Sequence, residues 1–171
     1  METQAPGMER FDSLRQLYVH ELKDLLSAED QILDALPEMA RRATSPELAE
    51  AFETHRQETA RQKRRLESIL EELDETGNAI RCEGLRGLTR EGEQIMEVPG
   101  PASVIDAALI ALANRVEHYE IAAYSAARGF ANALGLDDQA MILETTLEEE
   151  EAAEKVLSDI AIEINQRAAM R

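Results

Sequence analysis

The sequence predicts an all-α fold, a bundle of four long helices. Apolar residues make up 44% of the chain and aromatic residues only 4%, and alanine, leucine and glutamate, which favour helices, are prominent. Four segments carry apolar residues at the three-to-four-residue spacing of amphipathic helices. Most of the glycines and prolines gather in one central segment, about 76–102, which separates two halves of comparable length.

The first half predicts one helical hairpin. Residues 1–10 are expected to form a flexible N-terminal segment. A helix should follow over 11–42, where Pro37 can end or kink the run. Ser45, followed by a proline at the first helical position, predicts the start of a second helix that runs to about residue 75. Apolar residues of the first helix recur with a helical period at Leu14, Tyr18, Leu25, Ile32 and Leu36.

The second half predicts another hairpin. The central segment has room for a short helix at about 85–97. Ser103 with Asp106 resembles a capping box, which predicts a helix from about 103 that Gly135 can end. Asp137 is placed to cap a last helix that extends to about 167. Two short connections and a long central crossover therefore predict two helical hairpins in one domain over 11–167.

Composition narrows the classes of partner and compartment. A net charge of −17 argues against nucleic acid, because phosphate backbones are bound by clustered lysine and arginine. The sequence has neither the roughly 20-residue apolar run of a membrane span nor the apolar core of a signal peptide. The single cysteine, Cys82, cannot form an internal disulfide, which fits a reducing compartment. We therefore expect a cytoplasmic protein without a membrane or nucleic-acid partner.

Acidic residues lie on the apolar face of all four predicted long helices. This follows from counting about 100° per residue from the apolar stripe of each helix. Glu21 shares the face of the first helix, and Glu154 lies at the edge of the face of the last. His55 interrupts the stripe of the second helix and is expected to be an inward imidazole. The inward acids are Glu29, Glu58, Glu117, Glu120 and Glu150.

Buried acids need neutralisation, and a metal is one of several ways to supply it. An isolated ionised carboxylate in a core is costly, so it holds a proton, pairs with a cation or binds a metal. Carboxylates with an imidazole suit iron or manganese. The alternatives are a hydrogen-bonded core histidine at 55, a solvated face for the glutamate run 148–151, and pairing of Glu117 and Glu120 with Arg115, with Arg128 or with a tyrosine hydroxyl from another helix.

Five segments carry a resemblance to a known family. They are ELKDLLSAEDQILDALPEMA, SPELAEAFETHRQET, RCEGLRGLTREG, ALIALANRVEHYEIAAY and ETTLEEEEAAEKVL. Together they resemble the YciE/YciF branch of the ferritin-like proteins, over residues of about 11–165. The resemblance implies a ferritin-like four-helix bundle, association with stress, a homodimer and a di-metal site. The ligand set that it implies is Glu29, His55, Glu58, Glu117, Glu120 and Glu150. The helical count adds Glu21, Glu154, Tyr18 and Tyr124 as second-rank ligands or supporting groups.

Two departures from the wider ferritin-like pattern leave two functions open. That pattern has Glu-x-x-His on two helices, but Phe52 stands three residues before His55 and Ala153 three after Glu150. The first hypothesis is a protein that binds two metal ions and oxidises ferrous iron or consumes oxygen or peroxide. Iron is the preferred metal and manganese the alternative. The second is a non-enzymatic structural or interaction protein in which any metal only stabilises the bundle. Iron storage in a large shell would need an assembly surface that the sequence does not identify.

Overall fold

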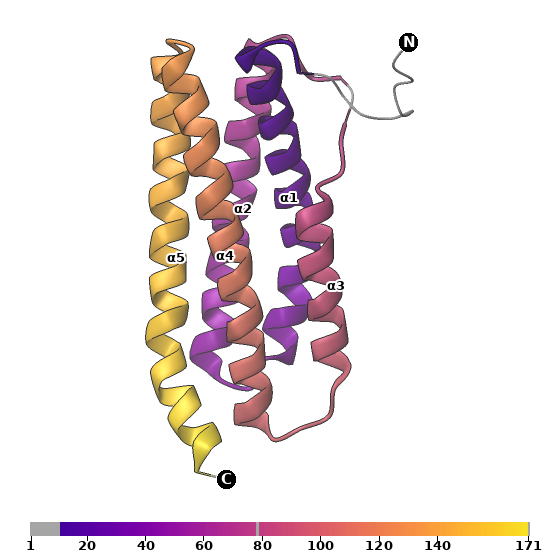
Figure 1. The fold of residues 1–171 in the computed structure, drawn as a ribbon. Coiled ribbons are helices and arrows are strands. Elements are labelled where there is room, and N and C mark those ends of the chain that lie inside the picture. Colours follow the sequence, from indigo (N-terminus) through magenta and orange to yellow (C-terminus); the bar gives the residue numbers. More distant parts are fainter. Residues whose placement is uncertain (1–10, 78, 171) are drawn as a thin grey trace.

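The computed structural model describes residues 11–77 and 79–170, which form α-helices joined by short loops (Figure 1). The prediction of an all-α fold is confirmed, while the segment expected at 1–10 lies outside the described residues. Among the described helices, none combines the length and apolar character needed to cross a membrane. The helices are α1 (Leu14–Arg42), α2 (Pro46–Glu72), α3 (Glu83–Glu97), α4 (Ala102–Ala133) and α5 (Asp137–Ala169).

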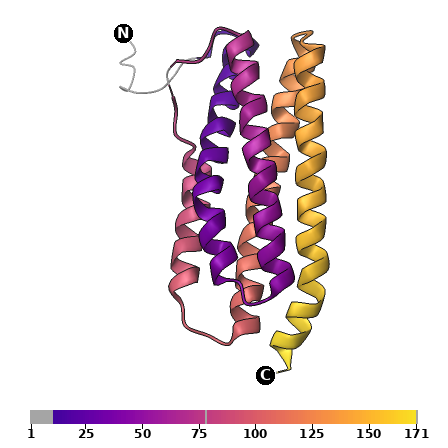
Figure 2. The same ribbon diagram turned by 180° about the vertical axis from the view of Figure 1, so that it is seen from behind.

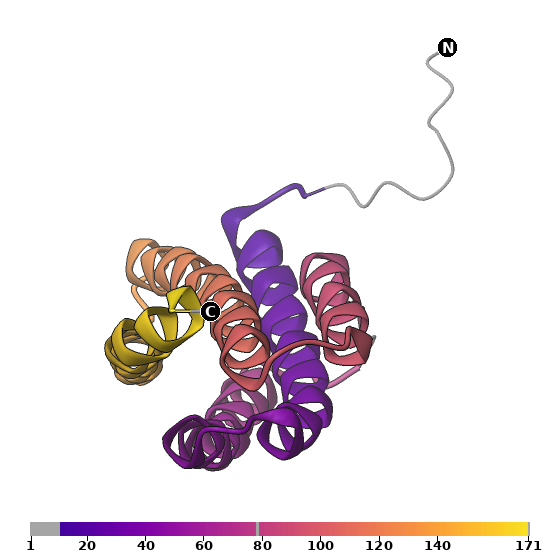
Figure 3. The same ribbon diagram turned by 90° about the horizontal axis from the view of Figure 1, so that it is seen from below.

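The four long helices pack as two hairpins. Within the hairpins α1 packs on α2 and α4 on α5, and between them α1 contacts α4 and α2 contacts α5. The chain after α2 runs down the outside of the bundle through α3 before α4 begins at the opposite end (Figures 1 and 2). In the view along the bundle, α3 lies beside α1 and α4, outside the four-helix arrangement (Figure 3). This is the crossover predicted from the central glycines and prolines.

Local capping chemistry sets several of the helix ends. The Ser45 side chain accepts a hydrogen bond from the Leu48 amide at 3.5 Å, as predicted for the start of α2. Gly135 has φ of 71°, and its amide and that of Leu136 bond back to carbonyls in the last turn of α4. A residue with a side chain is strained in this left-handed conformation, which explains the glycine after α4.

Pro37 lies inside α1, which runs through it to Arg42, where the predicted helix also ends. Two local predictions were wrong. Asp137 is the first residue of α5 rather than its cap. The capping box at the start of α4 does not form, because Asp106 accepts hydrogen bonds from the Thr44 and Ser45 amides at 2.8 and 3.0 Å and from the Thr44 hydroxyl at 2.6 Å. Asp106 thus ties the α1–α2 turn to α4 across the bundle.

A polar layer divides the apolar core into two clusters. One cluster includes Leu25, Leu66 and Leu147, and the other includes Ile32, Phe52 and Leu157. Each long helix passes from one cluster to the other, and where it does so it places polar side chains in the interior. These buried polar residues between the two clusters are Glu29, His55, Thr59, Gln62, Glu117, Glu120 and Glu150.

Candidate metal centre

Four side chains from three helices converge in the polar layer. His55 comes from α2, Glu117 and Glu120 from α4, and Glu150 from α5. Each offers one ligand atom, and these atoms lie within 4.8 Å of one another. All four side chains are buried, and the Glu120 and Glu150 residues are fully so. We call these residues the Glu/His cluster.

The polar atoms of the Glu/His cluster are largely unpaired. Neither carboxylate oxygen of Glu120 and neither ring nitrogen of His55 has a hydrogen-bond partner among the described residues. His55 Nε2 lies 3.4 Å from Glu117 Oε1, but without hydrogen-bond geometry. Buried polar groups are normally hydrogen-bonded, so several unpaired atoms at one place require an explanation. A cation among them would satisfy several at once.

Glu29 extends the acidic layer from α1. Its side chain is fully buried and accepts a hydrogen bond from the Tyr124 hydroxyl, while its second oxygen is unpaired. Burial and the charge of Glu150 raise the pKa of Glu29 well above its ordinary value, although the Tyr124 hydrogen bond opposes this. Glu29 lies outside the four-residue group but close enough to be influenced by it electrostatically. It stays a predicted ligand.

Glu58 lies at the edge of the site rather than inside it. Its side chain is 28% exposed, and its Oε2 is 4.0 Å from His55 Nδ1. Burial still raises the pKa of Glu58, against the opposing charge of Arg61. Its other oxygen, Oε1, lies 3.7 Å from the Arg61 guanidinium. Its role as a ligand also stays a prediction.

The cations that could have neutralised the α4 acids are used elsewhere. Arg115 is exposed and pairs with Glu91 of α3 at 3.0 Å. Arg128 forms its ion pair with Glu144 of α5. The one tyrosine hydroxyl in the layer, that of Tyr124, goes to Glu29. None of the arginine or tyrosine partners considered from the sequence therefore compensates Glu120.

Burial shifts the pKa values throughout the Glu/His cluster. It raises the pKa of Glu117 and Glu120 well above their ordinary value, and the charge of Glu150 adds to both shifts. Burial also raises the pKa of Glu150 to about 7 and lowers that of His55 to about 4. The cluster by itself therefore favours protonated carboxyls and a neutral imidazole. A cation would displace the carboxyl protons and use the imidazole as it stands.

The donor set fits a metal ion of intermediate hardness. Three carboxylates and one imidazole, fixed on helices and shielded from solvent, are the ligand types that iron and manganese take in proteins. Glu29 would bring a fourth buried carboxylate to the same layer. The unpaired oxygens and nitrogens thus match the iron or manganese ions that the resemblance to ferritin-like proteins implies.

The other sequence candidates lie at the margins. Glu21 is half-buried, and burial raises its pKa. Glu154 accepts a hydrogen bond from the Ser158 hydroxyl at 2.6 Å on its own helix. The Tyr18 hydroxyl donates to Gln139 at 3.0 Å rather than to a cluster carboxylate. Among the second-rank residues only Tyr124 donates to an acid of the layer.

Gln62 was missed by the sequence reasoning. It is buried on α2, and its amide nitrogen donates to Glu150 Oε1 and, at 3.1 Å, to Glu149 Oε2. Arg65 holds Glu149 from the same helix with two hydrogen bonds of 2.6 and 2.8 Å. Gln62 lies seven residues after His55, which places both on one helix face. The count that found His55 would therefore have found Gln62, had amides been considered beside acids.

A second polar group ties α3 to the bundle. The Tyr119 hydroxyl donates to Asp24 Oδ2 at 2.9 Å and lies 2.9 Å from the Cys82 sulfur. Cys82 is buried at the start of α3, where its sulfur accepts from the Leu85 amide. Burial raises the pKa of the Cys82 thiol, so this sulfur is suited to hydrogen bonding rather than nucleophilic attack.

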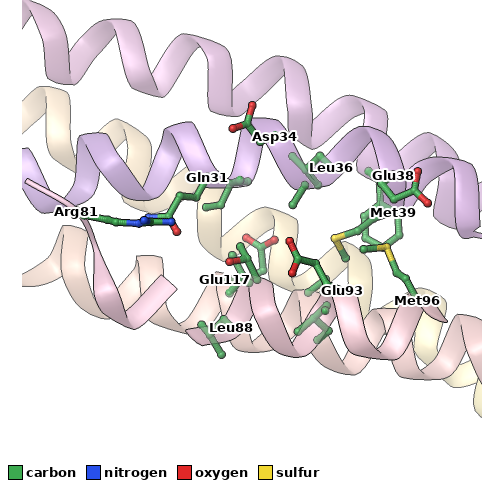
Figure 4. A pocket seen from close by; sticks show the side chains of 18 residues that line it. Gln31, Asp34, Leu36, Glu38, Met39, Arg81, Leu88, Glu93, Met96 and Glu117 are labelled. Carbon is green, nitrogen blue, oxygen red and sulfur yellow. The ribbon is translucent and has the colours of Figure 1, made fainter. Parts of the chain in front are cut away.

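Two cavities reach the Glu/His cluster from different sides. One, of about 340 Å³, lies between α1, α3 and α4; Figure 4 shows Arg81 at one end, the methionines Met39 and Met96 at the other, and Glu117 between them. The second, of about 540 Å³, lies between α2 and α5 and is bordered by His55 and Glu117. Phe52 lines both cavities. The buried site is therefore approached by two separate spaces.

Comparison with known proteins places the chain among relatives with the same fold. It is 37% identical to Protein YciF of Escherichia coli strain K12 over 158 residues, which are 91% of this chain and 95% of that protein. The crystal structure of the E. coli stress protein YciF matches with a TM-score of 0.88 and 36% identity, over 91% of this chain and 99% of that one.

Two further structures extend the comparison. YcfI of Rhodopseudomonas palustris matches with a TM-score of 0.83 and 36% identity, over 89% of this chain and 97% of its own. The dodecameric thioferritin of Bacteroides fragilis matches with a TM-score of 0.70 at 18% identity, over 92% and 91% of the two chains, which shows a shared ferritin-like fold. The family described as Domain of unknown function (DUF892) matches residues 13–170. The chain therefore belongs to this family of YciF-like, ferritin-like helical bundles.

Proposed function

We propose that this protein holds a carboxylate-rich centre of two metal ions, which reacts with ferrous iron and with oxygen or peroxide. Iron is the preferred metal and manganese the alternative. The observation that carries the proposal is the set of unpaired buried atoms on His55 and Glu120. If the core served packing alone, burying these polar atoms without hydrogen-bond partners would cost stability. The E. coli relative is described as a stress protein, which supports a role in stress.

The residues divide into the Glu/His cluster and two acids beside it. His55, Glu117, Glu120 and Glu150 would hold the first ion, since their donor atoms already converge. Glu29 and Glu58 would complete the site of the second. When bound, the metals would supply the two electrons that hydrogen peroxide needs, together with two protons, to become two water molecules.

The protein's own contribution is orientation and protection. The Tyr124 and Gln62 hydrogen bonds hold Glu29 and Glu150 at fixed positions, so their carboxylates do not have to reorganise when a cation arrives. Apolar clusters pack on both sides of the layer and shield it from water along the bundle axis. A cytoplasmic homodimer, with metal ions and small oxidants as its partners, completes the proposal.

Metal content tests the proposal directly. Protein purified without chelators, and apoprotein titrated anaerobically with ferrous iron, should bind metal in the wild type. A Glu120→Gln, Glu150→Gln double variant should bind far less, since two anionic ligands become neutral amides. Glu151→Gln is the matched control, because Glu151 is the exposed neighbour of Glu150 in the same glutamate run. If the wild type binds no more iron or manganese than the double variant, the proposal is wrong.

A structural role is the second candidate. Phe52 and Ala153 stand where the wider pattern has ligands, and the relative YcfI is described as a candidate structural protein. On this hypothesis a bound metal raises the melting temperature of the bundle, while the reduced protein consumes neither oxygen nor peroxide. An oxygen electrode and a peroxide assay on the iron-loaded protein distinguish the two functions.

A further inference from the structure

The α2–α5 cavity ends at unpaired ligand atoms. His55 is only 7% exposed, and both its ring nitrogens lack hydrogen-bond partners among the described residues. Glu117, with one unpaired oxygen, borders the same space. The cavity therefore leads from the surface to donor atoms that nothing in the described protein satisfies.

Small side chains keep this cavity open. Ala51 on α2 and the pair Ala152 and Ala153 on α5 line it together with His55. Ala153 is the position where the wider ferritin-like pattern carries a histidine ligand. An imidazole at 153 would occupy part of this space, so the residue that removes an expected ligand also opens a route to the site.

The two cavities differ in charge. The α2–α5 lining contains five acids besides Glu117 and no lysine or arginine: Glu47, Glu50, Glu58, Glu148 and Glu149. Arg65 neutralises Glu149, and Arg61 lies 3.7 Å from Glu58. That leaves Glu47, Glu50 and Glu148, which are exposed and have no ion pair within the described part of the chain.

The α1–α3–α4 cavity attracts a cation less strongly, because its lining is less negative. Its lining acids besides Glu117 are Asp34, Glu38 and Glu93. Arg41 pairs with Glu38, and Arg81 lines the same cavity with its own positive charge. The rest of the wall is mainly apolar. A hydrated divalent cation is drawn to the more negative of two cavities, since a funnel of one charge sign raises the local concentration of the opposite ion.

We infer that divalent cations reach the Glu/His cluster through the α2–α5 cavity, drawn by Glu47, Glu50 and Glu148, and not through the α1–α3–α4 cavity. The inference rests on the proposed metal centre and adds the route by which that centre fills. Glu117 lines both cavities but His55 lines only the α2–α5 cavity, so a cation arriving between α2 and α5 meets both of these ligand residues.

Two charge-matched double variants test the route. Glu50→Gln with Glu148→Gln removes two charges from the α2–α5 cavity, and Asp34→Asn with Glu93→Gln removes two from the other. Both change the net charge of −17 equally, to −15, so a general effect of charge appears in both. All four residues are exposed and lie outside the Glu/His cluster, and none has an ion pair or hydrogen bond within the described residues. The substitutions should therefore leave folding unaffected, and circular dichroism checks this.

The probe is Co²⁺, whose visible absorption on ligation is followed by stopped flow at low salt. The α2–α5 variant should bind Co²⁺ about threefold to tenfold more slowly than the wild type, while the other variant should stay within about twofold. Both should reach the wild-type stoichiometry at equilibrium. The rate difference should shrink in 0.5 M salt, where the Debye length falls to a few ångströms.

The outcomes separate the route from the centre itself. Wild-type protein that binds no Co²⁺ at equilibrium overturns the proposed metal centre, and the route with it. Normal stoichiometry with equal slowing in the two variants, or with greater slowing in the α1–α3–α4 variant, overturns the route alone.

Discussion

Replacing Glu150 by glutamine is expected to stabilise the metal-free protein at alkaline pH. Burial raises the pKa of Glu150 from 4.5 to about 7. Above that pH the folded protein must ionise a buried carboxyl that the unfolded chain ionises at no such cost. Glutamine is always neutral, and its side-chain oxygen can still accept the hydrogen bond from Gln62.

The magnitude follows from the pKa difference between the folded and unfolded states. A group whose pKa is raised by folding contributes stability at low pH, and that contribution is lost as the pH rises through the folded value. A shift from 4.5 to about 7 corresponds to about 3 kcal/mol. The glutamine variant should therefore gain about 3 kcal/mol over the wild type at pH 8, but less than about 1 kcal/mol at pH 5, where the wild-type carboxyl is protonated in the folded state.

Urea unfolding followed by circular dichroism measures the effect. Wild type, Glu150→Gln and the exposed control Glu151→Gln are compared at pH 5 and pH 8 with a chelator present, and the free energies are extrapolated to water. The control should differ little from the wild type at either pH. A Glu150→Gln variant that is less stable than the wild type at pH 8, or whose advantage is equal at both pH values, would falsify the assignment of Glu150 as a buried acid destabilised by its ionisation.

Two further predictions concern the scaffold. Asp106→Ala should lower the free energy of unfolding by about 2–4 kcal/mol in urea titration, because the Thr44 amide and hydroxyl lose a charged acceptor; a loss below about 0.5 kcal/mol would show that the α1–α2 turn does not depend on this residue. Gly84→Ala should destabilise α3 by about 1–3 kcal/mol, because a Cβ there would lie 2.8 Å from the Tyr119 ring, whereas Gly87→Ala on the same helix meets nothing within 4 Å and should be neutral or stabilising. Equal melting temperatures for the two alanine variants would contradict this packing argument.

Helix ends were predictable where the capping partner is local. Ser45 and Gly135 act on backbone groups within a few residues, so their sequence context is sufficient. The expected capping box at Ser103 failed for the opposite reason. Asp106 has its partners in the turn between α1 and α2, about 60 residues earlier in the chain. A local pattern cannot show that a distant backbone amide will compete for the same carboxylate.

The inward acids were predictable as faces but not as a site. Counting about 100° per residue shows which side of a helix Glu29 or Glu120 occupies. It does not show at what height each acid lies relative to those on the other helices. The packed bundle brings Glu120 into the four-residue group, leaves Glu29 beside it with Tyr124, and puts Glu58 at the edge.

By itself the sequence determined the helical fold, the crossover and the presence of carboxylates and an imidazole on inward faces, because these depend on periodicity and composition along one chain. Only the tertiary structure decided which of those side chains meet. Packing sent Arg115 and Arg128 to other acids and brought Gln62 to Glu150. It also opened one acid-lined cavity to His55. Distances between helices follow from how their surfaces interlock, and that information is spread over the whole chain.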